Sequence, residues 1–83
     1  MSKQEPMKVP VSLRALMQRI NRILAKDSER LCKARTERER LDRYMGPFYL
    51  INESRNELIG GRLDPEELGR NLGALKPWEY LDS

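Results

Sequence analysis

The strongest hydrophobic pattern in the chain has the period of an α-helix. Between residues 13 and 26, apolar side chains recur at intervals of three or four, which places them on one helix face. These side chains are Leu13, Leu16, Met17, Ile20, Ile23 and Leu24. Ser12 is a favourable N-cap directly before them. The pattern predicts a helix over 13–26, and its polar face carries Arg14, Gln18, Asn21, Arg22 and Lys26.

Residues 64–73 carry the signals of a second, shorter helix. Asp64 is a favourable N-cap, Pro65 fits the first helical position, and Gly73 fits a left-handed C-terminal cap. Gly69 lies in the interior of this helix, where glycine costs about 1 kcal/mol relative to alanine. We therefore expect either that another element packs closely against Gly69 or that the helix is marginal.

Two short apolar runs between the helices predict a β-hairpin. The runs 47–52 and 57–61 flank the polar residues 53–56, which have the length of a hairpin turn. Side chains alternate between the faces of a strand. Phe48 and Leu50 are therefore expected on one face of the sheet, and Tyr49 and Ile51 on the other.

The stretch 28–46 has two interpretations. A strand over 30–36 followed by an Arg-rich loop over 37–46 would add a third strand to the hairpin, which alone is marginal in water. A helix over 28–45 is the alternative, because oppositely charged residues recur there at a spacing of four. We favour the strand and keep the helix open.

The two ends of the chain differ in character. Residues 1–9 have the pattern of a flexible polar tail, so a single domain is expected over 10–83. Residues 75–81 are apolar near the terminus, and we expect Trp78 and Leu81 to pack on the core. Trp78 as an exposed anchor for a partner is the alternative.

These elements predict an α+β fold, with a small antiparallel sheet of two or three strands covered on one face by the N-terminal and the C-terminal helix. If the helices cover one face only, the other exposes apolar surface, and a two-fold homodimer would bury it. The expected core consists of Leu16, Met17, Ile20, Ile23, Leu24, Phe48, Leu50, Leu58, Leu68, Leu72 and Trp78.

Composition argues against enzyme chemistry. The 83 residues include no histidine and one cysteine, which excludes imidazole-based sites and an internal disulfide framework. Basic neighbours of Cys32 could lower its thiol pKa, although a lone cysteine is more often a small core residue. No catalytic motif, metal site or cofactor motif is present, and no apolar run has the length of a membrane helix. We expect a non-enzymatic cytoplasmic protein that uses no cofactor and no metal and contacts no membrane.

Charge is distributed unevenly along the chain. Residues 1–45 hold twelve basic and six acidic residues, a net charge of +6, whereas residues 46–83 hold four and seven, a net charge of −3. Such a basic region suits phosphates or an acidic protein surface, and plain solubility is the alternative. The candidate nucleic-acid-binding residues are Arg14, Arg22, Lys33, Arg35, Arg38, Arg40 and Arg43.

Aromatic residues are absent from the Arg-rich segment 30–43, so the Tyr49 face of the hairpin is the only candidate platform for stacking with a base. Tyr49 and Trp78 are also the candidate anchors for a protein partner. We expect a nucleic acid-associated binding module. The alternative is a protein–protein interaction module, an inhibitor or adaptor encoded by a mobile element.

Several short motifs resemble a group of small bacterial proteins that occur on plasmids and other mobile elements. The motifs are Leu13-x2-Leu16-x2-Arg19-Ile20-Asn21-Arg22, Phe48-Tyr49, Arg55-Asn56, and Asp64-x3-Leu68-Gly69-Arg70-x-Leu72-Gly73-x-Leu75-Lys76-Pro77-Trp78-Glu79. The resemblance spans roughly residues 9–80. It implies a cytoplasmic bacterial accessory protein and transfers no catalytic residue.

Overall fold

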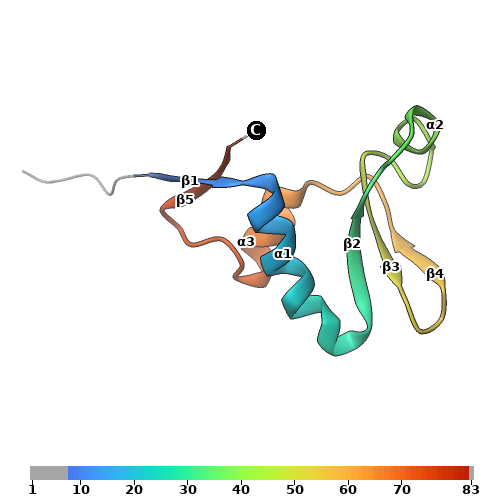
Figure 1. Cartoon of the computed structure of the whole chain (residues 1–83), viewed down its shortest axis with the longest axis horizontal. Coiled ribbons are helices and arrows are strands. Elements are labelled where there is room, and N and C mark those ends of the chain that lie inside the picture. Colours follow the sequence, from blue (N-terminus) through green and yellow to red (C-terminus); the bar gives the residue numbers. More distant parts are fainter. Residues whose placement is uncertain (1–7, 83) are drawn as a thin grey trace, which may run out of the picture.

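Helices and short strands alternate along the chain in the computed structural model, which describes residues 8–82 (Figure 1). The helices are α1 (Leu13–Leu24), α2 (Glu37–Arg40) and α3 (Pro65–Leu72), and a 3-10 turn, η1 (Ala25–Asp27), extends α1. The strands are β1 (Val9–Ser12), β2 (Glu29–Lys33), β3 (Phe48–Asn52), β4 (Glu57–Gly60) and β5 (Glu79–Asp82). The fold is α+β, as predicted.

The larger sheet contains three antiparallel strands in the order β2-β3-β4. Cys32 lies opposite Tyr49, and Leu31 lies opposite Leu50. The predicted hairpin is confirmed, and a strand is present in the ambiguous stretch, although it covers 29–33 instead of 30–36. A helix over 28–45 is therefore wrong, because β2 pairs along its length with β3.

The Arg-rich segment after β2 differs from the predicted loop. Its first residues form the single helical turn α2, because the Thr36 hydroxyl accepts the Glu39 N–H at 3.1 Å and caps the turn. The Glu39 carboxylate in turn accepts the Arg35 N–H at 3.2 Å. This capping pattern explains why a four-residue helix forms where we expected irregular structure.

Both long helices begin where their caps predict. The Ser12 hydroxyl accepts the Ala15 N–H at 3.1 Å, and the Asp64 carboxylate accepts the Glu66 N–H at 3.0 Å. Gly73 ends α3 with a φ of 79°, in the left-handed region that favours glycine. Helix α1 ends at Leu24, and the predicted residues 25 and 26 belong to η1.

A second sheet joins the two ends of the described chain. Strands β1 and β5 pair in parallel, with Val11 opposite Leu81 (Figure 1). The predicted tail over 1–9 falls mainly on residues 1–7, outside the described residues, and Val9 begins β1. Each strand is only four residues long and its partner is distant in sequence, so no local pattern indicated this pairing.

Helix α1 lies at the centre of the core, against β2 on one side and α3 on the other. The buried hydrophobic residues that form the core are Val11, Leu16, Ile20, Leu24, Leu31, Ala74 and Leu75. Most other predicted core residues pack around this cluster, but the prediction was wrong for Leu58 and Trp78, which are 42% and 47% exposed. Ala74 and Leu75, which the prediction did not include, are buried in the core.

Candidate nucleic-acid interface

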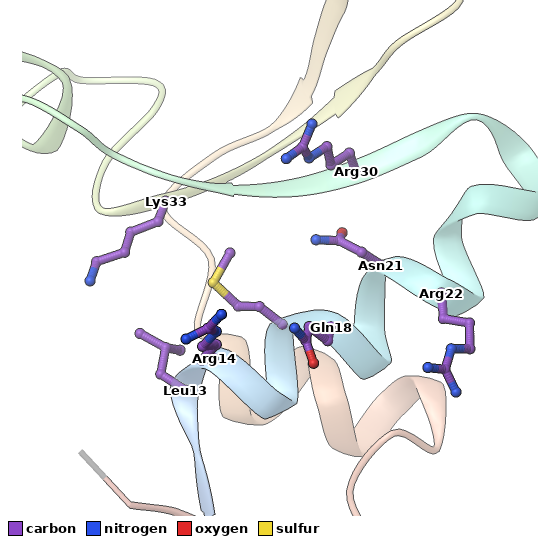
Figure 2. A pocket seen from close by; sticks show the side chains of 8 residues that line it. Leu13, Arg14, Gln18, Asn21, Arg22, Arg30 and Lys33 are labelled. Carbon is purple, nitrogen blue, oxygen red and sulfur yellow. The ribbon is translucent and has the colours of Figure 1, made fainter.

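A basic groove runs between α1 and β2, and we call it the α1–β2 groove (Figure 2). Its lining residues are Leu13, Arg14, Met17, Gln18, Asn21, Arg22, Arg30 and Lys33. Four of the eight carry a positive charge, and none carries a negative charge. Such a surface attracts anions, because four cationic residues line one hollow with no carboxylate among them.

The groove combines the polar face of one helix with an edge strand. Arg14, Gln18 and Arg22 recur every fourth residue, so they project from the same face of α1. Strand β2 contributes Arg30 and Lys33 from the opposite wall, as Figure 2 shows. The two walls come from elements that are adjacent in the chain and joined by the tight turn η1.

Asn21 holds the two walls together. Its side-chain N–H donates to the Leu31 carbonyl at 3.2 Å, and its side-chain oxygen accepts the Leu31 N–H at 2.7 Å. Leu31 belongs to β2, an edge strand whose outward N–H and C=O groups have no neighbouring strand among residues 8–82. The Asn21 amide takes the place of that strand and fixes the distance between α1 and β2.

The positive charge of the groove is largely uncompensated. Within residues 8–82, no ion pair involves Arg14, Arg22 or Lys33. Arg30 pairs with Glu53 at 3.5 Å, and both side chains are more than half exposed. An exposed pair of this kind contributes about 0–1 kcal/mol. The groove therefore presents cations that can exchange partners with an incoming anion.

A second hollow adjoins the groove over β2 and β3, and we call it the β2–β3 platform. Cys32, Ala34, Arg35, Glu39, Tyr49 and Ile51 line it, together with residues shared with the groove. Met17, Asn21, Arg30 and Lys33 line both hollows, so the two form one continuous surface. Glu39 is the one acid in the lining, and its carboxylate already accepts the Arg35 N–H.

Burial sets the ionisation of the platform. It raises the pKa of the Cys32 thiol, and this effect outweighs the Arg30 charge, which acts in the opposite direction. Our suggestion that basic neighbours lower this pKa was wrong, because desolvation dominates. Burial also raises the pKa of the Tyr49 phenol. Both groups are neutral at physiological pH, so the platform carries no negative charge from them.

The seven predicted nucleic-acid-binding residues fall into two groups. Arg14, Arg22 and Lys33 line the groove, and Arg35 lines the platform. The other three lie at α2 and in the turn that follows it, outside both hollows; they are Arg38, Arg40 and Arg43. Arg40 is paired with Glu37 at 2.6 Å, within the single turn of α2.

Sequence reasoning missed Arg30 as a member of the groove. The sequence did contain a signal for it, because Arg30 is a basic residue of the predicted strand and lies next to the apolar Leu31. Its position beside α1 nevertheless depends on the contact between Asn21 and Leu31, which no periodicity reveals.

The two predicted partner anchors lie apart. Tyr49 lines the platform in the middle of the three-stranded sheet, whereas Trp78 lies directly before β5, in the part of the fold formed by the smaller sheet. Figure 1 shows these two sheets at opposite sides of α1.

Comparison with known proteins gave no match to a family model, to a curated protein or to a solved structure. Within the described part of the chain, no cluster of three or more metal-ligating side chains occurs. No helix among residues 8–82 is long and apolar enough to cross a membrane. The charge and shape of the groove are the features from which a function can be argued.

Proposed function

We propose that this protein is a non-enzymatic module that binds nucleic acid through the α1–β2 groove. The observation that carries the proposal is that Arg14, Arg22, Arg30 and Lys33 all line one open groove whose lining holds no acid. Phosphate groups recur along a nucleic acid backbone, so several cations along one groove can contact more than one phosphate. Arginine adds a planar donor fork that pairs with two phosphate oxygens at once.

The architecture of the groove supports this role. Helix α1 is held between β2 and α3, so its cations project from a rigid support. Gln18 adds an exposed amide between Arg14 and Arg22, which can donate to a phosphate or accept from a base. A packed backbone support lowers the entropic cost of binding, because a ligand then has to order only the side chains.

The Arg-rich segment around α2 would contribute more weakly. Arg38 and Arg43 form no ion pair within residues 8–82, and α2 follows directly after the platform residue Arg35. We expect these two arginines to attract the backbone beyond the groove. Arg40 contributes least, because Glu37 already occupies its guanidinium.

A protein partner is the second candidate, and the exposure of Trp78 favours it. Trp78 is 47% exposed although its backbone is held in place, since its carbonyl accepts the Val9 N–H at 2.8 Å. A fixed, exposed tryptophan is a common anchor of protein interfaces. An inhibitor or adaptor with an acidic partner would use this site together with the basic surface.

The proposal also includes the finer arrangement expected from the sequence. Helices α1 and α3 would cover one face of the three-stranded sheet, which is supported by the packing of Phe48 and Leu50 against the buried cluster around Leu31. The opposite face would remain free for a ligand or for a second copy in a homodimer. The resemblance to proteins of bacterial mobile elements would place the chain in the cytoplasm.

The test is to remove the charge of the groove and measure binding. Arg14→Ala, Arg22→Ala and Lys33→Ala in one chain should weaken the binding of a fluorescent oligonucleotide at least 10-fold at about 100 mM salt, and should flatten the slope of log K against log salt. The matched control removes three cations outside the groove, namely Lys26, Arg55 and Lys76. If the control loses as much affinity as the groove variant, binding reflects net charge alone and the groove is not the site.

A further inference from the structure

The β2–β3 platform places the aromatic ring of Tyr49 beside the cations of the groove. Tyr49 lies opposite Cys32 on β2, and Ile51 lies opposite Arg30, so these side chains share the face of the sheet that turns away from Leu31 and Leu50. Leu31 is buried in the core, and Leu50 packs against it. The Tyr49 face is therefore the one that the core leaves open.

The chemistry of the platform matches a nucleobase with its flanking phosphates. Tyr49 is partly buried, and Cys32 and Ile51 line the same hollow. Arg35 lines the platform beside it, and Arg30 and Lys33 line both the platform and the groove. Stacking on an aromatic ring with cations along the backbone is how proteins hold single strands without reading their sequence.

A duplex fits this surface less well. In a duplex each base is already stacked between its neighbours, so it cannot lie on Tyr49. A helix that reads a duplex enters the major groove with its polar face projecting freely. The polar face of α1 instead has β2 beside it, because the Asn21 side chain is hydrogen-bonded to the Leu31 backbone.

Charge also argues against a second copy of this chain as the occupant. The platform carries Arg30, Lys33 and Arg35 against the single carboxylate of Glu39. A two-fold interface would bring these cations face to face, and like charges at an interface are unfavourable.

We propose that the ligand is single-stranded nucleic acid, whose phosphates lie in the α1–β2 groove while one base stacks on Tyr49. This inference rests on the proposed function. The groove supplies the positive charge that attracts phosphates, and stacking on Tyr49 of the platform favours unpaired bases. Removing Tyr49 should therefore change affinity and strand preference without changing the salt dependence, because no charge is lost.

The experiment compares a single-stranded oligonucleotide of about 12 nucleotides with a blunt duplex of the same sequence, by fluorescence anisotropy at about 100 mM salt. Tyr49→Ala should weaken single-strand binding by about 5- to 150-fold, the range of one lost stacking contact. Tyr49→Phe should retain the affinity, since the ring is kept. Tyr80→Ala is the matched control, because Tyr80 is an exposed tyrosine of β5 that lines neither hollow. If Tyr49→Ala does not fold, Tyr49→Leu replaces it, since leucine fills the site without an aromatic face.

The outcomes separate this inference from the proposed function. Equal binding of single strand and duplex, with no effect of Tyr49→Ala, would overturn the inference and leave groove binding in place. If folded wild-type protein binds neither strand form, the proposed function fails and this inference fails with it. A dimer in light scattering that Tyr49→Ala dissociates, with single-strand affinity unchanged, would assign the platform to a second copy instead.

Discussion

A β-carbon built on Gly69 of α3 would lie only 2.8 Å from the Cδ1 atom of Leu16 on α1. Leu16 is completely buried and Gly69 is also buried, so glycine is the residue that lets the two helices approach. Of the two explanations for this interior glycine, close packing is the one that holds. This contact between Leu16 and Gly69 holds α1 against α3.

Replacing Gly69 with alanine should therefore lower stability, even though alanine is the better helix former. The substitution gains about 1 kcal/mol of helix propensity, but the added methyl forces Leu16 to move in a filled core, which costs about 1–3 kcal/mol. We expect a net loss of up to about 2 kcal/mol, measured by urea unfolding. Asn71→Ala, at an exposed position of the same helix, is the control and should not destabilise. A higher urea midpoint for Gly69→Ala would show that Leu16 can repack.

Asn21→Ala tests what holds β2 beside α1. The variant leaves the N–H and C=O of Leu31 without their side-chain partner, and an unmet backbone pair costs about 1–3 kcal/mol. The same variant should raise the hydrogen exchange rate of the Leu31 amide. Gln18→Ala, which removes an exposed amide from the same helix face, should leave both stability and exchange unchanged. Equal stability of the two variants would mean that the bonds of Asn21 do not position the strand.

The C-terminal strand should loosen in acid. Arg19 donates to the Glu79 carboxylate at 2.9 Å and the Lys76 N–H donates to it at 2.8 Å, and these bonds hold the pKa of Glu79 below its ordinary value. A group whose pKa is lowered by folding stabilises the protein above its unfolded pKa, about 4.3 for Glu, and loses that contribution as pH falls through the folded pKa.

The measurement is thermal unfolding of wild type and Glu79→Gln between pH 7 and pH 3. Wild type should unfold at a higher temperature at pH 7, and the difference should shrink below about pH 4. A difference that stays constant over this range would mean that the ionisation of Glu79 does not contribute to stability.

The parts of the fold that local patterns encode could be predicted, and the parts that depend on distant contacts could not. The periodic leucines and the caps at Ser12 and Asp64 locate both helices, because those signals lie within the helices themselves. Strand β1 has no such signal, since its partner β5 lies at the other end of the chain. Trp78 was assigned to the core because apolar side chains near a chain end are expected to be tied down, but within residues 8–82 only its carbonyl is bonded, to the Val9 N–H, and its side chain is exposed.

The candidate site was predictable to a similar degree. Charge along the chain indicated Arg14, Arg22 and Lys33, because they lie on elements whose faces the pattern defines. The charge pattern gave equal weight to Arg38, which lies in α2, and to Arg43, which lies in the following turn, although neither lines the groove or the platform. Which arginines share a groove depends on how α1 meets β2, a tertiary contact that composition does not contain.

The central claim is that nucleic acid binds in the α1–β2 groove, and a chemical-shift titration of the isotope-labelled protein with a single-stranded oligonucleotide tests it most directly. We predict that the largest amide shifts fall on Arg14, Gln18, Arg22, Arg30 and Lys33, with Tyr49 next to them on the platform. Their magnitude should decrease as salt is raised, because phosphate contacts release counterions. Saturable shifts centred on Trp78 and β5, or no shifts at all with folded protein, would contradict the account.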